Sequence, residues 1–395
     1  LWKDDNTWFG TYVNGYAQAT LGGANSAQAH DVARAAADDG RLIPGTAAFD
    51  SAFETVVNDP NLLTGAKFQD NSKIYHADWN YNFSDMLDWA EIQVGGSFRQ
   101  YSLNSSGTIY TDYDGPIDYR ETGVYSQLVK DFLDEDRLRL TAAARYDKSE
   151  FFDGQVTPRV SLAYTAGEFK NHNIRLGYQT GFRNPSTQGL FIGLDLGVAK
   201  LVGGAPDNPS RFSADYDVSV DGQAMGMPAS VTLTGDSAYT NSYSVSSVTA
   251  FAAAAATGNI DPTILERSGA DYVVPEEMIQ FELGYRGKFL FDDHSVSSLI
   301  IDANVYRNDF KNFINTLTVV TPIYGSISDG SAVAAIGNQD FDAWSVYTNA
   351  DAEVASWGAT IGMEAQVGSF DLGASYAKQV LEFDRDAYPD FDTNW

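Results

Sequence analysis

Apolar and polar residues alternate with a period of two along much of the chain. The first clear example has Tyr75, Ala77, Trp79, Tyr81 and Phe83 at odd positions, with polar residues between them. The same alternation recurs at about 138–146, 160–164, 174–178, 279–285, 299–305, 357–367 and 370–376. A period of two places apolar side chains on one face of a β-strand and polar side chains on the other. With less regular segments at 7–20, 90–101 and 117–130, about eleven strands are expected, each long enough to cross a bilayer at a tilt.

The connections between these expected strands differ in length in a regular way. Short turns fall at 84–89, 131–136, 167–172, 289–295 and 368–369, and long loops fall at 21–71, 102–116, 147–156, 182–276 and 312–346. Short turns on one side and long loops on the other are typical of an outer-membrane barrel. The pattern predicts an all-β fold, a transmembrane antiparallel β-barrel whose long extracellular loops carry short helices. A soluble sandwich is the alternative, but its strands are seldom so long or so regularly connected.

The long loops have local patterns of their own. Ala27–Asp38 is rich in alanine and is expected to form a helix, capped by Ser26 and ended by Gly40. A second short helix is expected near Asp261–Arg267, because Asp-Pro is a favourable helix start. The segment 182–276 carries ten acidic and four basic residues. Such a long loop is expected to be either a binding surface or an acidic coat over the barrel mouth.

Composition and charge exclude several classes of protein. The 395 residues include 53 Asp and Glu against 25 Lys and Arg, for a net charge of −28, which would repel nucleic acid. Because the chain has no cysteine, disulfides and thiolate metal sites are excluded. No apolar run is long enough for a transmembrane helix, and the first residues show no targeting signal.

Residues suited to catalysis or metal binding are sparse. The histidines are His30, His76, His172 and His294. Their spacing matches no zinc motif, and neither a nucleophile elbow nor a phosphate-binding loop occurs. The acidic segments Asp112–Gly115 and Asp384–Asp392 lack the spacing of a calcium loop, so exposed acidic loops without metal are the preferred interpretation. We therefore expect no catalytic residues, no metal and no cofactor.

Three segments carry short motifs in a fixed order along the chain. Thr157–Tyr164 begins with Thr-Pro-Arg, and Pro275–Tyr285 begins with Pro-Glu and ends with Gly-Tyr. Between them, Tyr178–Gln188 contains Gly181, Phe182, Arg183, Asn184 and Pro185. This last motif resembles the Gly-Phe-Arg-x-Pro motif in the barrels of TonB-dependent outer-membrane receptors, and the two flanking segments are similar to strands of the same barrels. Arg145-Tyr-Asp147 fits the strand before. The loop helices and the acidic balance resemble a Bacteroidota-type member.

This resemblance implies a portion of a 22-stranded barrel in the outer membrane of a Gram-negative bacterium. A plug domain would fill the lumen, and a short segment would contact the TonB energy-transducing complex. Neither the plug nor the closing strands are expected within residues 1–395, so the chain is expected to be part of a longer receptor. The segments 21–71 and 182–276 would be its long extracellular loops.

The implied function is the binding of a scarce nutrient at the extracellular loops and its import with energy from TonB. Ferric siderophores, cobalamin, oligosaccharides and peptides are the candidate substrates. The TonB complex would contact the missing N-terminal segment, and a surface lipoprotein is a further candidate partner. A passive porin-like channel and a structural or adhesive barrel are the alternatives.

Polar residues on the expected lumenal face are the candidate ligand-binding residues. They are Arg145, Arg175, Gln179, Arg183, Glu282 and Arg286. Arg145 and Arg183 are expected near the outer mouth, where an incoming ligand would first meet the barrel. The competing role of each residue is to hydrate the lumen or to pair with a neighbour or a plug. The motif at Gly181–Pro185 also has a conformational explanation, because Asn-Pro favours an extended exit from the strand.

Overall fold

The computed structural model describes residues 5–61, 64–197, 200–292, 295–350, 352, 354–384, 386 and 390–391. The chain divides into two compact units, Leu1–Phe68 and Gln69–Trp395, each of which is described by itself. Among the described residues, no helix combines the length and the apolar character needed to cross a membrane. His294 and much of the acidic segment Asp384–Asp392 lie outside the described residues.

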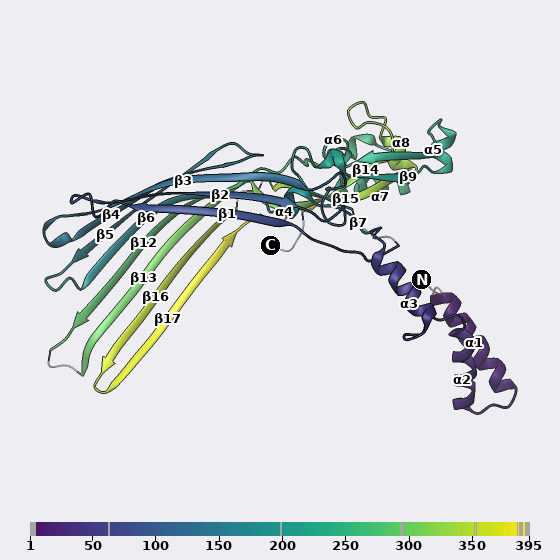
Figure 1. Cartoon of the computed structure of the whole chain (residues 1–395), viewed down its shortest axis with the longest axis horizontal. Coiled ribbons are helices and arrows are strands. Elements are labelled where there is room, and N and C mark those ends of the chain that lie inside the picture. The colour runs from purple at the N-terminus through teal and green to yellow at the C-terminus, as the bar shows by residue number, and fades with distance from the viewer. Residues whose placement is uncertain are drawn as a thin grey trace. The chain divides into compact units, whose positions relative to one another are not determined.

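The first unit is helical (Figure 1). It contains α1 (Asp5–Leu21), α2 (Ser26–Ala37) and α3 (Ala47–Asn58). Ala29, Ala33 and Ala37 of α2 are fully buried, which lets α2 pack closely against α1. The expected helix at Ala27–Asp38 is thus confirmed, although Asn25 rather than Ser26 is its N-cap. Gly40, just beyond the helix, adopts a φ of 78°, which favours glycine.

The strand expected at 7–20 is wrong, because these residues form α1. Trp8, Tyr12 and Tyr16 recur every fourth residue, the spacing of one helix face. The rings of Trp8 and Tyr12 stack at 5.3 Å, and the Trp8 indole N–H donates to Asp38 beyond α2 at 2.9 Å. The apolar pattern of this segment was too loose to separate a strand from a helix, and packing against α2 decided it.

The second unit is built on a ten-stranded antiparallel sheet. Its strands, in spatial order, are β1 (Lys73–Asn82), β2 (Glu91–Leu103), β3 (Ile117–Phe132), β4 (Leu138–Ser149), β5 (Gln155–Ala166), β6 (His172–Arg183), β12 (Glu276–Leu290), β13 (Val296–Lys311), β16 (Val354–Val367) and β17 (Phe370–Glu382). Every expected strand other than 7–20 is confirmed. The strands form a broad curved sheet with β1 and β17 at its edges (Figure 1), so the described residues make a partial barrel that is not closed.

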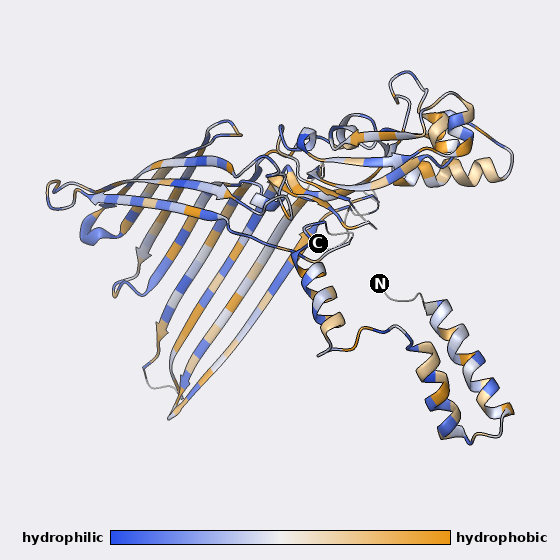
Figure 2. Cartoon of the chain, turned by 45° about the vertical axis from the view of Figure 1, so that its right-hand side comes forward, coloured by the Kyte–Doolittle hydropathy of each residue, from blue (hydrophilic) through white to orange (hydrophobic). Residues whose placement is uncertain are grey.

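One face of the sheet is apolar and exposed. Trp79, Leu176 and Phe281 are between 52% and 57% exposed. The register keeps this face continuous, since Leu176 stands opposite Leu162 on β5 and Leu283 on β12. Apolar and polar residues accordingly alternate along the strands in Figure 2. A soluble sandwich would bury these side chains, whereas contact with lipid makes their exposure favourable. The sandwich alternative is therefore excluded for this sheet.

The connections 182–276 and 312–346 were expected to be long loops. In the structure they instead fold together. We call residues 184–275 and 313–350 the cap. Its five-stranded sheet has the order β11 (Tyr243–Ser244), β14 (Phe313–Pro322), β15 (Phe341–Ala350), β8 (Lys200–Val202), β7 (Gly193–Asp195), and a separate hairpin pairs β9 (Ser213–Asp217) with β10 (Ser230–Thr234). Its helices are α4 (Thr187–Phe191), α5 (Val220–Ala224), α6 (Asp236–Thr240), α7 (Val245–Ala256) and α8 (Val333–Gly337). The helix expected near Asp261–Arg267 is only a 3₁₀ turn, Pro262–Ile264, that Asp261 caps.

The cap has an apolar core of its own. Trp344, Val346 and Val319 are fully buried there. The Trp344 indole N–H donates to the Tyr216 hydroxyl at 2.8 Å, and that hydroxyl donates to Asp342 at 2.8 Å. Asp342 also pairs with the nearly buried Lys200 at 2.6 Å. The chain therefore places a packed, hydrogen-bonded domain on the long-loop side of the sheet.

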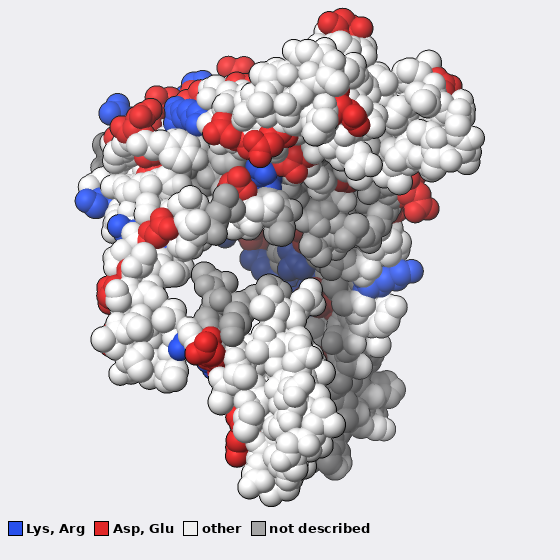
Figure 3. All heavy atoms as spheres, turned by 90° about the vertical axis from the view of Figure 1, so that its right-hand side faces the viewer, with Lys and Arg blue, Asp and Glu red and all other residues white. Residues whose placement is uncertain are grey.

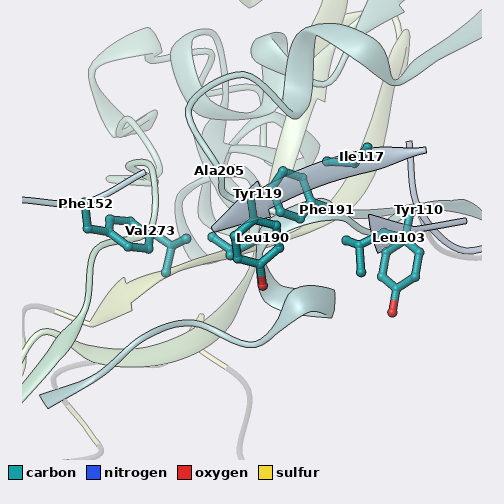
Figure 4. Close-up of a cluster of buried hydrophobic side chains, with 9 residues drawn as sticks. All are labelled: Leu103, Tyr110, Ile117, Tyr119, Phe152, Leu190, Phe191, Ala205 and Val273. Carbon is teal, nitrogen blue, oxygen red and sulfur yellow. The ribbon is translucent and has the colours of Figure 1, made fainter. Parts of the chain in front are cut away.

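A cluster of buried apolar side chains joins the sheet to the cap (Figure 4). Tyr119, Leu190 and Phe191 lie at its centre, and Tyr110 and Phe152 lie towards its ends. Next to it, Asp112 accepts hydrogen bonds from the backbone N–H groups of Ser105, Ser106 and Gly107 at 2.6, 2.8 and 2.9 Å. The expectation that Asp112–Gly115 is an exposed acidic loop is therefore wrong for Asp112, whose carboxylate is buried and shapes this loop.

Candidate ligand-binding site on the polar face of the sheet

The polar face of the sheet contains a concavity of about 670 Å³ next to the cap. We call it the cap-side pocket. Strands β1 to β4 supply one wall, and Phe182 with residues 184–187, where β6 leads into α4, supplies another. Its titratable side chains, Tyr excepted, are His76, Asp78, Arg99, Glu121, Arg145, Asp147 and Lys148, and its aromatic side chains are Tyr101, Tyr119 and Phe182.

Arg145 is held in the pocket wall by a two-point ion pair. Its Nε and Nη2 atoms each lie 2.6 Å from an oxygen of Asp147, and Nη2 also donates to Ser97 at 2.9 Å. Gly123 stands opposite Asp147 on the neighbouring strand. A Cβ atom there would lie 2.3 Å from both Arg145 Nη2 and Asp147 Oδ1. Because Gly123 has no side chain, the Arg145 guanidinium has room to lie over β3.

Glu121 is the centre of a second group in the same wall. Its carboxylate accepts hydrogen bonds from Asn184 Nδ2 at 2.8 Å and from the Tyr101 hydroxyl at 3.3 Å. Arg99 pairs with it at 4.0 Å. The Tyr101 ring stacks on Tyr119 with centroids 4.5 Å apart and planes 7° apart. Because Tyr119 belongs to the buried cluster of Figure 4, this wall is rigidly supported.

The motif Gly181–Pro185 anchors the end of β6. Arg183 pairs with Glu276 at the start of β12, at 2.7 Å. Glu276 has only 10% of its side chain exposed, and it also accepts the backbone N–H of Ile314 on β14 at 3.3 Å. Asn184 bonds Glu121 on β3, and Pro185 is followed by Ser186, which caps α4. These contacts support the conformational explanation of the motif.

The remaining predicted residues lie further from the cap on the same polar face. Arg175, Gln179 and Glu282 line a concavity of about 240 Å³. Gln179 bonds Gln280, and Glu282 accepts from Asn304 at 3.1 Å. Still further along β12, Arg286 shares Asp302 with Arg175, at 3.6 and 3.4 Å.

The structure therefore does not bring all the predicted residues into one site. Arg145 lines the cap-side pocket, and Arg183 stands beside it, bound to Glu276. The other predicted residues lie in two regions of the polar face that are further from the cap. Their role in ligand binding stays a prediction.

Sequence reasoning missed three residues of the pocket wall. Glu121, Tyr101 and Tyr119 were not among the candidates, although β2 and β3 were expected as neighbouring strands. Their register sets Arg99 opposite Glu121 and Tyr101 opposite Tyr119. Aligning the two strands to place the Arg99 guanidinium next to a carboxylate would have found them.

The sequence matches the family model described as "TonB dependent receptor-like, beta-barrel" over residues 2–395. The chain belongs to the TonB-dependent receptor family. Members are receptors and transporters rather than enzymes, which agrees with the prediction that the chain is not an enzyme. The fold, a large antiparallel sheet with long connections on one side, is that of an outer-membrane barrel.

The comparison with solved structures finds an iron transporter and a siderophore receptor among the matches. The FrpB iron transporter from Neisseria meningitidis shares 11% identity at a TM-score of 0.42, over 79% of this chain and 36% of that one. The siderophore receptor PirA from Acinetobacter baumannii shares 11% identity at a TM-score of 0.43, over 78% and 36% of the two chains. This chain thus spans about a third of their length. No protein of curated function shows a match.

Proposed function

We propose that this TonB-dependent receptor binds a scarce nutrient in the cap-side pocket and admits it along the polar face of the barrel. The observation that carries the proposal is a series of concavities on that one face. After the cap-side pocket comes the concavity at Gln280 and Glu282. A third, of about 310 Å³, follows at Arg286, Asp302 and Glu364. Since β12 runs away from the cap, these sites follow one another from the long-loop side towards the short turns.

The cap supports this proposal because a folded domain stands on the long-loop side, where a ligand would arrive. A porin that works by passive diffusion has no need of a packed cap with a fully buried Trp344. Energy would come from the TonB complex, acting on a plug domain of the whole receptor, and a surface lipoprotein is a candidate partner. Ferric siderophores, cobalamin, oligosaccharides and peptides remain the substrate classes, and a Bacteroidota-type host is part of the same proposal.

Uptake by cells that express the full-length receptor tests this function. Cells with and without the gene are given radiolabelled members of each substrate class, before and after collapse of the proton gradient. We expect uptake of one class that requires the gene and stops when the gradient collapses. Uptake that continues without a gradient would overturn the proposal and indicate a porin. Normal growth on every nutrient, with loss of cell adhesion on gene deletion, would overturn it in favour of an adhesive barrel.

A further inference from the structure

We infer that the cap-side pocket binds a neutral, polyhydroxylated ligand, an oligosaccharide. This inference rests on the proposed function and names its substrate class. The first observation is charge balance. The three carboxylates of the pocket wall, those of Asp78, Glu121 and Asp147, are matched by the cations of Arg99, Arg145 and Lys148. A wall that neutralises itself offers no net attraction to an anionic or a cationic ligand.

The second observation is the form of the polar groups in the wall. Guanidinium and carboxylate groups are planar and present several donors or acceptors at fixed spacing. Arg145 uses two of its three nitrogens within the wall, and its side chain is 38% exposed. Arg99 is 47% exposed. Neighbouring hydroxyl groups of a sugar ring each donate and accept, so they suit a wall in which donors and acceptors alternate.

The third observation is the aromatic part of the wall. Tyr101, Tyr119 and Phe182 line the pocket beside the charged groups. Aromatic rings supply apolar area with little entropy to lose on binding. Tyr101 is stacked on Tyr119, which is itself fixed in the buried cluster of Figure 4. The C–H faces of a sugar ring would pack on such a surface while its hydroxyl groups bind the planar side chains.

The charge of the cap argues against an anionic ligand. Residues 184–275 and 313–350 contain twelve Asp and Glu against three Lys and Arg. Figure 3 shows acidic side chains in several groups on this face, with basic side chains between and below them. Such a field repels a negatively charged metal chelate and leaves a neutral ligand unaffected. A pocket of about 670 Å³ lies within the usual size range of small-ligand sites.

Binding by the purified full-length receptor in detergent tests the inference. Short neutral gluco-, xylo- and manno-oligosaccharides are compared with a ferric tris-catecholate, haem and cyanocobalamin by calorimetry. We expect one oligosaccharide series to bind, with an affinity that changes little with salt because no net charge is neutralised. Binding of only the iron chelate, haem or cyanocobalamin would overturn the inference. So would an affinity for every sugar too weak to measure.

Two variants place the binding in the pocket. Arg99→Gln removes an exposed donor group from the pocket wall, and we expect it to weaken oligosaccharide binding about tenfold. Arg139→Gln changes the same kind of residue on the polar face of β4, where Arg139 pairs with Asp131 at 2.8 Å outside the named concavities, and is expected to leave the affinity unchanged. Unaltered heat-dependent gel mobility checks that both variants fold. Equal affinities of Arg99→Gln and the unchanged receptor would overturn the assignment to this pocket.

The two proposals fail in different ways. Sugar binding without gradient-dependent uptake would contradict the proposed function and leave the pocket assignment standing. Gradient-dependent uptake of a siderophore, without sugar binding, would contradict the pocket assignment and leave the receptor function standing.

Discussion

The ten-stranded sheet and the cap place the same types of residue in opposite environments. On the sheet, Trp79 and Leu176 are 57% and 52% exposed, whereas in the cap Trp344 and Val346 are fully buried. Both regions contain antiparallel strands. The difference shows that the surrounding medium decides whether apolar side chains must be buried. The apolar face of the sheet is stable in contact with lipid, whereas the cap lies in water and is stable only with its apolar side chains buried in a core.

Removal of Trp344 should have the largest effect of the changes that probe this comparison. Trp344→Ala opens a cavity in the cap core and removes the hydrogen bond to Tyr216, so we expect a loss of about 3–5 kcal/mol of cap stability. Limited proteolysis of the receptor in detergent should show rapid cleavage within the cap and an intact sheet. Trp79→Ala, on the exposed face of β1, is the matched control and should not alter the cleavage pattern. If the Trp344→Ala and Trp79→Ala variants resist proteolysis equally, the proposed contrast between the cap and the sheet is wrong.

A charge on the apolar face should have the next largest effect. Leu176→Arg places a guanidinium in lipid near the middle of β6 and should cost about 2–4 kcal/mol. Ser161→Arg adds the same group to the polar face of the neighbouring strand, and we expect little loss there. Urea titration of receptors folded into lipid vesicles measures both changes. If the two variants lose equal stability, the assignment of the two faces is wrong.

The contact between the sheet and the cap should respond to a change at Glu276. Glu276→Ala leaves the Ile314 N–H and the Arg183 guanidinium without their shared acceptor, at a cost of about 1–3 kcal/mol. Amide hydrogen exchange at Ile314 should become faster. Glu276→Gln keeps an acceptor oxygen and should show a smaller change. Unchanged exchange in the Ala variant would mean that this contact does not hold β14 in place.

High pH should produce the smallest effect on the cap. Burial and the hydrogen bond to Asp342 raise the pKa of Tyr216 above its ordinary value of 10.0. The folded cap therefore holds this proton more tightly than the unfolded chain, so cap stability is complete below pH 10.0 and falls as the pH rises above it. Tyr216→Phe cannot titrate and should show a flatter pH dependence of cap proteolysis. A parallel decline in both proteins would assign the effect to other groups.

The strands of the sheet were predictable because their environment is uniform. Residues at 157–165 and 172–181 keep a strict alternation, since one face meets lipid and the other meets the polar interior. The segment 7–20 has no such constraint, so its loose apolar pattern does not distinguish a strand from a helix, and contacts with α2 decide for the helix.

The strands β14 and β15 were missed for a different reason. The neighbour of β15 on one side is β8, a short strand far away in the sequence. Along β14, the residues Val319–Pro322 are all buried, so no alternation of buried and exposed positions marks that strand. No local pattern within 312–346 indicates that β8 pairs with β15.

The candidate site was only partly predictable. Arg145 and the motif at Gly181–Pro185 stood out because residue type and motif were visible in the sequence. The sequence did not show that Arg145 would be bound to Asp147, that Arg183 would be bound to Glu276, or that Asn184 would reach Glu121. Arg183 and Asn184 pair with residues 93 and 63 positions away, and only the strand register decides which of them meet.

The sequence by itself determined the family, the ten membrane strands and the side of the sheet on which long connections lie. These features depend on residue type, local periodicity and short motifs. The tertiary structure alone decided that the long connections form a packed cap and that charged side chains from four strands neutralise one another in one pocket. Such pairings join residues distant in the sequence, and their energies depend on distance and burial, which periodicity does not record.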